Sequence, residues 1–402
     1  MATLVAKPIA LSPARTAART LAICHFTTAH VQLKSRSYHR TFLPLAMGGV
    51  RVCYLSPAES PGSNDGVDFL TIPKRGGLLR FIADFPSLLR TLARQRADLY
   101  HFQDPELLPA ALALKLLFRR RVVYDAYEDF PSSVEHKQSI PRLLRPLAAR
   151  AMALLEIAAA RLFDGLITAD PLTLRRLAPH GESRKLVFYN FPNLDLFPVP
   201  ESSEKSFDLV YRGGISERTG AYVLLEAMRL LAGRARPVRL LLIGYFDNAA
   251  AESAFRRRVR ALHLESQVEF QGRIEHEEMA AALGRAGIGI SPLLAIPKFL
   301  RNIPVKIFEY WACGIPAIAT DLPPVRPFFR NSQAGLLVPP GSAHALARAI
   351  ATLLDDPERT AHMAAQGRRL VVERFNNARE IHKLSRFLAG LANPRMEDAR
   401  RA

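Results

Sequence analysis

The residues best suited to chemistry, Lys306 and Glu309, lie in the stretch IPVKIFEYWACGIPAIATDLP at positions 303–323. Its apolar pattern predicts a helix over residues 305–313, which Gly314 ends as a left-handed cap. Lys306 and Glu309 share one face at the start of this helix, where a cation and unpaired backbone NH groups attract phosphate. A carboxylate one turn later can accept hydrogen bonds from the two hydroxyls of a ribose. The pair therefore favours a nucleotide, and a plain salt bridge on a packed helix is the alternative.

The size of the chain bounds the elements that position these residues. It has 402 residues, of which 49% are hydrophobic, enough for two domains with full cores. No apolar run reaches the roughly 18 to 20 residues that span a bilayer, because charged residues interrupt each run. Cys24, Cys53 and Cys313 are too scattered for a disulfide framework, and no Cys-x-x-Cys spacing indicates zinc. These features predict a globular protein in a reducing compartment.

The formal net charge of +18 favours anionic partners, which include phosphorylated metabolites, acidic lipid and nucleic acid. The amino-terminal region is the most one-sided, since no Asp or Glu precedes Glu59. Residues 1–19 carry arginine and no acid, as a transit peptide does, but a short flexible leader is the interpretation we favour.

From about residue 20, short apolar runs alternate with longer amphipathic stretches, which is the rhythm of an α/β fold. The runs of the first half lie at residues 20–28, 50–57, 97–104, 121–127, 165–170 and 185–190. Those of the second half lie at residues 207–214, 238–244, 267–272, 287–293, 316–321 and 335–339. Such runs are typical of buried parallel strands, whose ligands bind beyond the carboxyl ends. The sequence thus predicts two doubly wound, Rossmann-like domains that face each other across a cleft.

The domain boundaries are predicted from composition. Residues 20–196 form the first domain, the polar and proline-bearing residues 197–206 a linker, and residues 207–375 the second domain. Residues 376–402 are expected to form a helix and tail, whose return to the first domain is a hypothesis.

Five segments, in order, carry a family resemblance: FTTAHVQLKSRSYHR, ADLYHFQDPELLP, YDAYEDFP, VYRGGISERTG and PVKIFEYWACGIPAIATDLP. They are similar to segments of the retaining, two-domain glycosyltransferases of family 4 (glycosyl transferases group 1), in a bacterial polysaccharide-biosynthesis branch. With FYNFPN the resemblance covers roughly residues 20–375. It implies the two-Rossmann architecture called GT-B, with a nucleoside diphosphate sugar bound mainly by the second domain and an acceptor mainly by the first.

The resemblance also implies how the donor is held. Lys306 and Arg218 would neutralise the leaving diphosphate as catalytic cations, since no Asp-x-Asp pair suggests a metal, and no cofactor is implied. Glu309 would bind the ribose. Further donor-binding candidates lie at strand ends or before the 305–313 helix: Gly213 and Gly214, where no Cβ hinders diphosphate oxygens, and Gly272, Arg273, Ile274 and Asn302.

Two departures from the family pattern concern the donor side. The family's basic residue usually occupies the position of Thr219, so either Arg218 or Arg212 takes over its role. Many members carry Glu at the position of Arg301, a change that bears on sugar choice more than on activity. For the Gly-Gly pair a tight turn is the alternative, and for Arg273 an ordinary surface position.

On the acceptor side, polar residues of the first domain follow the strands and are candidates to line the cleft: His30, Arg36, His101, Asp104, Asp125 and Glu128, with Tyr127 as a third catalytic candidate. The branch usually has Asp at the position of Lys34 and His at those of Gln103 and Tyr127. These departures favour a changed donor or acceptor preference, or a reduced activity. For each candidate a structural polar group is the alternative.

Residues 142–163, RLLRPLAARAMALLEIAAARLF, predict an apolar helix that carries arginines and could rest on anionic lipid. We favour a core helix with snorkelling arginines, because Ala and Leu cover too much of its circumference for a surface element. The basic run at 119–121 and the net charge still suit peripheral contact with a membrane.

The sequence and the resemblance together predict a metal-independent, retaining hexosyltransferase on the cytoplasmic side, with a glycan or lipid-linked acceptor. One alternative is a weakened relative that binds a nucleotide sugar or partners an active transferase. A nucleic-acid-binding protein is less favoured, since it explains the charge but none of the five segments, and no basic and aromatic stripe is present. The identity of the sugar, nucleotide and acceptor, the linkage and the oligomeric state cannot be read from the sequence.

Overall fold

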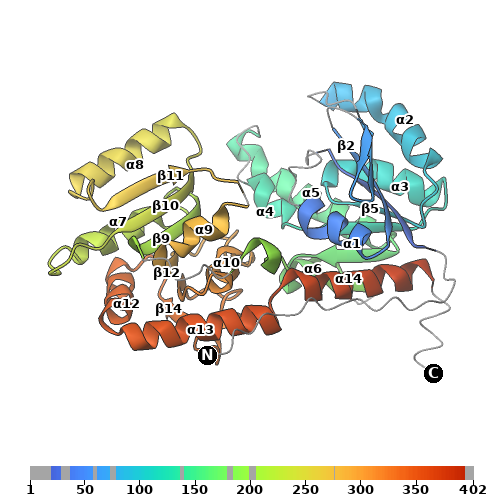
Figure 1. Cartoon of the computed structure of the whole chain (residues 1–402). Coiled ribbons are helices and arrows are strands. Elements are labelled where there is room, and N and C mark those ends of the chain that lie inside the picture. Colours follow the sequence, from blue (N-terminus) through green and yellow to red (C-terminus); the bar gives the residue numbers. More distant parts are fainter. Residues whose placement is uncertain are drawn as a thin grey trace.

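The chain folds into two α/β domains, each built around a mostly parallel sheet (Figure 1). The computed structural model describes residues 20–28, 37–57, 61–72, 78–135, 140–178, 184–198, 205–275 and 277–393. The expected leader at 1–19, the candidates His30 and Arg36, and the position of Lys34 lie outside the described residues.

The first sheet, as far as the chain is described, has the strand order β3-β4-β2-β1-β5-β6-β7-β8 and is parallel except for β3. Its strands are β1 (Ala22–Phe26), β2 (Arg51–Ser56), β3 (Gly62–Asn64), β4 (Val67–Thr71), β5 (Leu99–Phe102), β6 (Val122–Ala126), β7 (Gly165–Thr168) and β8 (Arg184–Val187). The six strands predicted here are confirmed. The hairpin of β3 and β4 was not predicted, although Asp65 and Gly66 between them, both with positive φ, are a hairpin signal.

The second sheet has the order β11-β10-β9-β12-β13-β14 and parallel pairing throughout these strands. Its strands are β9 (Phe207–Gly214), β10 (Leu240–Tyr245), β11 (Val268–Gly272), β12 (Ala286–Ser291), β13 (Ala317–Thr320) and β14 (Gly335–Val338), and all six were predicted. The winding direction reverses beside β1 in the first sheet and beside β9 in the second. Ligands of doubly wound sheets bind at the carboxyl end of such a switch point.

Helices cover both sheets. Those before the second domain are α1 (Leu43–Met47), α2 (Leu78–Arg94), α3 (Leu108–Leu116), α4 (Phe130–Glu135), α5 (Arg145–Ala160) and α6 (Pro171–Leu177), with the short turns η1 (Tyr38–Phe42), η2 (Pro105–Leu107), η3 (Arg142–Leu144) and η4 (Leu194–Leu196). Those after it begins are α7 (Ala221–Leu230), α8 (Ala249–Ala261), α9 (Met279–Gly284), α10 (Lys306–Ala312), α11 (Arg326–Phe329), α12 (Ala343–Asp355), α13 (Pro357–Glu373) and α14 (Asn377–Ala392). Among the described residues, no helix is both long and apolar enough to cross a bilayer.

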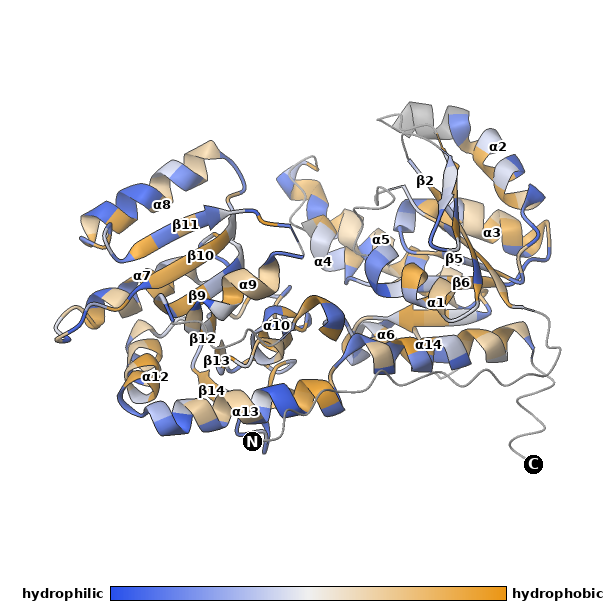
Figure 2. Cartoon of the chain, in the orientation of Figure 1, coloured by the Kyte–Doolittle hydropathy of each residue, from blue (hydrophilic) through white to orange (hydrophobic). Residues whose placement is uncertain are grey.

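The carboxyl-terminal helix joins the two domains. Helix α13 runs under the second domain and α14 continues under the first (Figure 1). Leu384, Leu388 and Leu391 of α14 belong to the same buried cluster as Ile23 and Val52 of the first sheet. Figure 2 shows the strands that these helices cover as strongly hydrophobic elements. The end of the chain therefore completes the core of the domain in which the chain begins.

The interpretation of residues 142–163 as a core helix is wrong. The segment forms η3 and α5, and α5 buries a narrow face that includes Ala149 and Ala159. Leu147 and Leu154 on the same helix are 67% and 69% exposed. The small alanine side chains of this face let α5 lie close to its neighbours α4 and α6. The leucines lie on the other side of the helix, which faces solvent.

Candidate active site

The candidate donor site lies at the carboxyl end of β9, in the middle of the second sheet. The ammonium of Lys306, at the first position of α10, lies 4.2 Å from the centroid of the Tyr211 ring in β9. Gly213 of β9 has φ = +130°, and a Cβ there would lie 3.3 Å from Lys306 Nζ. The fold thus brings a cation against a strand end at which the backbone carries no side chain. We call this strand end together with α10 the donor wall.

Lys306 is a partly neutralised cation. Burial and the nearby Arg212 guanidinium lower the pKa of Lys306 to about 7, while the Glu309 carboxylate acts in the opposite direction. The free protein therefore holds both forms of this amine near neutral pH. An anion that arrives beside Lys306 would favour the protonated form.

Glu309 is 1% exposed and pairs with Arg212, whose Nη1 lies 2.8 Å from Oε2 of the carboxylate. The backbone NH of Arg212 donates to the Tyr310 hydroxyl at 3.0 Å, and that hydroxyl donates to the carbonyl of Ile290 in β12 at 3.1 Å. These contacts fix α10 against β9 and β12. Sequence reasoning considered Arg212 only as a cation for the diphosphate and missed its pairing with Glu309, which depends on packing between distant segments.

Helix α10 differs in detail from the predicted one. It spans Lys306–Ala312 and is shorter at both ends, and Val305 before it provides no side-chain cap. Gly314 adopts the predicted left-handed conformation, with φ = +66°. Every residue of α10 after Lys306 is buried, so the helix has no solvated face. In so short a helix the lysine ammonium, rather than the helix end, is the main positive group.

In the loop after β9, Thr219 and Arg218 make different contacts. The Thr219 hydroxyl donates to the carbonyl of Gly214 at 2.9 Å and closes the turn. Arg218 pairs with Asp247 at 3.4 Å, and both side chains are half-exposed. Arg212, rather than Arg218, is therefore the arginine that pairs with Glu309 and lowers the pKa of Lys306.

The candidates after β11 lie beside an exposed aromatic ring. The Arg273 guanidinium lies over the Tyr245 ring at the end of β10, 4.0 Å from its centroid. Gly272 is left-handed, with φ = +69°, and Ile274 packs against the core of the second domain. Tyr245 belongs to β10, the strand next to β9, and a Cβ at Gly214 would lie 3.8 Å from its ring, so the ring and the guanidinium extend from the donor wall toward β11. An aromatic ring with a guanidinium over it is a surface of the kind that stacks on a base.

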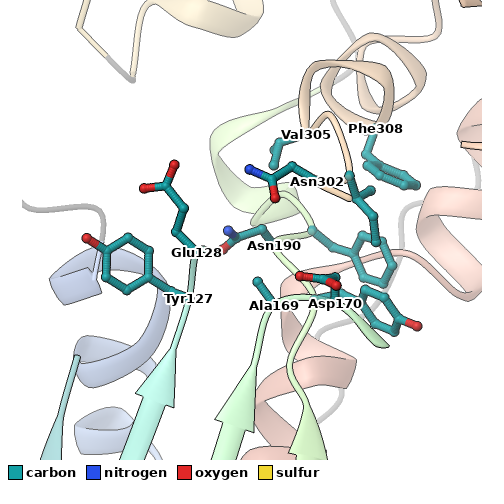
Figure 3. Close-up of a pocket in the computed structure, with 11 residues that line it drawn as sticks. Tyr127, Glu128, Ala169, Asp170, Asn190, Asn302, Val305 and Phe308 are labelled. Atoms are coloured by element: carbon teal, nitrogen blue, oxygen red, sulfur yellow. The ribbon is translucent and has the colours of Figure 1, made fainter. Parts of the chain in front are cut away.

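A cavity of about 260 Å³ opens where the two domains meet (Figure 3). It is lined by Tyr127, Glu128, Ala169 and Asp170 after strands of the first sheet, by Tyr189, Asn190 and Phe191 after β8, and by Asn302, Ile303, Val305 and Phe308 of the second domain. Figure 3 shows the Asn190 and Asn302 amides on facing sides of this space. Burial, together with the carboxylates of Asp104 and Glu128, raises the pKa of the Tyr127 phenol, so Tyr127 remains a hydrogen-bond donor.

Two ion pairs cross from the second domain to the first beside this cavity. Lys298 Nζ lies 2.8 Å from Glu128 Oε1, and Arg301 Nη1 lies 2.7 Å from Asp129 Oδ2. Arg301 thus points to the first domain from the position at which many relatives of the resembled family carry an acid.

The strand ends of β1, β5 and β6 form the acceptor wall, and several of its predicted site residues are buried. His101 Nδ1 lies 2.9 Å from the Nδ1 of His25, and its Nε2 lies 3.5 Å from Asp125. The Gln103 amide donates to Asp125 at 2.7 Å. Asp104 is 2% exposed and accepts from the Thr27 hydroxyl and the Thr28 backbone NH. His101, Asp104 and Asp125 therefore support the wall from behind, while Tyr127 and Glu128 reach the cavity.

Comparison with known protein families assigns both halves of the chain. Residues 35–190 match the family described as Glycosyl transferase 4-like domain, and residues 194–370 match Glycosyl transferases group 1. Among the described residues, no group of three or more His, Cys, Asp or Glu side chains is arranged to hold a metal ion.

Curated relatives align with part of the chain. The chain is 27% identical over 179 residues to the amylovoran biosynthesis glycosyltransferase AmsK of Erwinia amylovora. This alignment covers 44% of the chain and 43% of AmsK. The chain is 29% identical over 236 residues to the putative colanic acid biosynthesis glycosyltransferase WcaL of Escherichia coli, covering 57% of each. The chain thus spans less than two thirds of the length of these relatives.

Solved structures align with nearly all of the chain. A sucrose-phosphate synthase from Thermosynechococcus elongatus superposes with a TM-score of 0.71 at 20% identity, covering 92% of this chain and 99% of that one. The HepE protein of Anabaena in complex with UDP gives 0.70 at 16% identity, covering 92% and 100%. The predicted GT-B fold is confirmed. The chain belongs to the glycosyltransferases, with a glycosyl transferase 4-like domain followed by a glycosyl transferases group 1 domain.

Proposed function

We propose that the protein transfers a sugar from a nucleoside diphosphate sugar to a glycan acceptor with retention of configuration. The observation that carries the proposal is Lys306, a half-buried amine of lowered pKa placed against the open backbone of Gly213. A diphosphate at this strand end would meet Lys306 directly. The UDP bound in the related HepE structure supports a nucleotide as the donor group.

The transfer needs a positive group where charge develops on the leaving oxygen. The bond between the anomeric carbon and the β-phosphate oxygen breaks, and its electron pair leaves with the diphosphate. The acceptor hydroxyl oxygen bonds to the same face of that carbon, and its proton passes to the departing phosphate oxygen. Lys306 would stabilise the diphosphate, with Arg212 adding positive charge nearby, and Glu309 would bind the ribose. We propose that these cations act without a divalent metal.

We propose a lipid-linked glycan as the acceptor and the inner face of the cell membrane as the place of reaction. The relatives AmsK and WcaL are described as enzymes of amylovoran and colanic acid biosynthesis, which supports a cell-surface polysaccharide as the product. Tyr127 and Glu128, which face Asn302 across the cavity, are the residues we assign to the reacting sugar and the acceptor.

A weakened relative that binds the donor without transfer is the second candidate. The observation in its favour is that cross-domain ion pairs engage Glu128 and Asp129, which flank the cavity on the acceptor side. Such pairs would have to open or shift for an acceptor to use these carboxylates.

Calorimetric titration with UDP and GDP tests donor binding, and a panel of nucleotide sugars with EDTA present tests hydrolysis. The transferase predicts heat with one nucleotide and release of sugar without metal. Heat without hydrolysis would favour the weakened relative, and no heat with either nucleotide would contradict both.

A further inference from the structure

Helix α5 presents an apolar face to solvent. Leu143 in η3 is 94% exposed, and Leu147 and Leu154 of α5 are about two-thirds exposed. Leu144, Leu155 and Leu162 are also largely exposed. A soluble surface helix normally turns such residues toward the core, so this helix has the reverse of the usual arrangement.

The exposed residues form one stripe along the helix. The exposed positions are 146, 147, 150, 151, 154, 155, 158, 161 and 162, and each lies three or four residues from another member. Such spacing places them on one side of a helix. Arg150 lies in the stripe, while the opposite face buries Ala149, Glu156 and Ala159.

The charge of this surface is positive. Within residues 142–163 the acid is Glu156, which is buried and contacts Arg176 and Tyr124. Arg142, Arg150 and Arg161 are exposed. The apolar face therefore carries cations at intervals and no exposed acid.

The end of α3 extends the same surface. Lys115 Nζ lies 2.7 Å from Asp164 Oδ1, which places the end of α3 beside the residues that follow α5. Leu117 and Phe118 after Lys115 are 74% and 42% exposed, and the exposed Arg119 follows them. We call the exposed residues of η3, α5 and 116–121 the α5 surface.

We propose that the α5 surface docks on an anionic lipid bilayer, with α5 lying in the plane of the headgroups. Leucines would enter the boundary of the acyl chains and arginines would meet lipid phosphates. A second copy of the chain fits less well, because a symmetric contact would bring like-charged arginines together. The charge pattern therefore favours anionic lipid as the occupant.

The position of the α5 surface also indicates how a lipid-linked acceptor would reach the cavity, an inference that rests on the proposed function. Helix α5 packs against α4, which begins at Phe130, directly after Asp129 and the cavity residue Glu128. Docking through the α5 surface would hold the acceptor side of the cavity near the headgroups. A lipid-linked glycan would then reach the donor without leaving the bilayer.

Sedimentation of the full chain with vesicles tests the docking directly. Vesicles of phosphatidylcholine with and without phosphatidylglycerol are compared at low and high salt, with the triple variant Leu147→Ser, Leu154→Ser and Leu155→Ser. We expect wild-type protein to bind the anionic vesicles and lose binding with salt. The triple variant should bind on the order of 100-fold more weakly, because three leucines no longer enter the acyl boundary.

Matched variants and a second readout make the result decisive. Met47→Ser removes an equally exposed side chain, 78% accessible, elsewhere in the first domain and should leave vesicle binding unchanged. Circular dichroism checks that the triple variant is folded.

Absence of wild-type binding at low salt, or equal binding by the triple variant, would overturn the proposal. Light scattering that shows a wild-type dimer lost in the triple variant, without vesicle binding, would overturn it in favour of self-association. UDP titration separates the two proposals: vesicle binding without nucleotide binding keeps the surface and removes the transferase.

Discussion

The donor wall and the acceptor wall hold their charged groups in different ways. On the donor wall, desolvation and then the nearby Arg212 lower the pKa of Lys306, although Glu309 pairs with Arg212. On the acceptor wall, His101 and Asp125 belong to a buried network in which His25, His101, Asp125 and Gln103 contact one another through polar atoms.

The difference indicates which wall gains from a ligand. A wall whose buried polar groups already have partners keeps its shape without a substrate. A wall that holds an amine of lowered pKa beside a second cation favours an anion, which interacts with both positive groups and raises the pKa of Lys306 again. Above the pKa of the free protein, the protonation of Lys306 on binding costs part of that interaction free energy. We therefore propose that the donor wall binds the diphosphate and that the buried acceptor-wall residues support the structure.

Replacement of Lys306 is expected to have the largest effect. Lys306→Ala should lower the turnover of an accepted nucleotide sugar by about 10² to 10³-fold, because the ammonium that would face the leaving group is lost. The melting temperature without ligand should not fall, since the variant removes a partly desolvated amine that lies beside another cation. The control is Lys205→Ala, which removes another lysine of lowered pKa, one that donates to the Gly284 carbonyl away from this site. Unchanged turnover in Lys306→Ala would remove the donor-wall assignment.

Replacement of Glu309 should separate ribose binding from phosphate binding. Glu309→Gln keeps the shape of the side chain and weakens its hydrogen bonds, so UDP should bind roughly 10 to 100-fold more weakly. Inorganic pyrophosphate, which has no ribose, should bind with undiminished affinity. Calorimetry with both ligands measures this. An equal loss for the two would mean that Glu309 acts through the charge of Arg212 instead.

The affinity for UDP should depend on pH through Lys306. The pKa of Lys306 is lowered from 10.5 to about 7 in the free protein, and a bound diphosphate raises it again. Binding therefore takes up a proton, and above pH 7 the affinity should fall by up to about tenfold per pH unit until the pKa of the complex is reached. The same shift makes folding stability rise between pH 7 and 10.5, where the unfolded chain binds the extra proton. Calorimetry in buffers of different ionisation enthalpy counts the proton, and Lys306→Arg should lose this dependence.

Replacement on the acceptor wall should affect stability and leave donor affinity as it is. His101→Ala deprives His25 and Asp125 of a buried partner, which should cost about 2 to 4 kcal/mol in the free energy of unfolding. UDP should bind as it does to the unaltered protein. Urea denaturation measures the stability, and calorimetric titration with UDP measures the affinity. A large loss of UDP affinity in a folded variant would contradict the different roles proposed for the two walls.

Some of the molecule could be predicted from local pattern. The twelve predicted strands are all present, because a buried parallel strand must be continuously apolar and ends where polar residues begin. Gly314 was identified as a left-handed cap because few other residues adopt that conformation without strain. The position of Lys306 at the start of a helix followed from the apolar pattern, and its role toward a diphosphate was implied by the family resemblance.

Other features depend on contacts between distant segments. Arg212 and Glu309 are far apart in the chain, and their 2.8 Å ion pair exists only because α10 packs against β9. His101 was a candidate to face the acceptor, yet it is buried and its ring lies within hydrogen-bond distance of His25 on the neighbouring strand.

The contrast between α5 and α10 shows why sequence alone was insufficient. Both are apolar helices with charged residues, and composition determined that each would be a helix. Tertiary structure decided which side of each meets solvent: α10 is enclosed by its own sheet and α13, whereas α5 is covered along a narrow alanine face. Helix formation depends on neighbours within one turn, but burial depends on what the rest of the chain places against the helix.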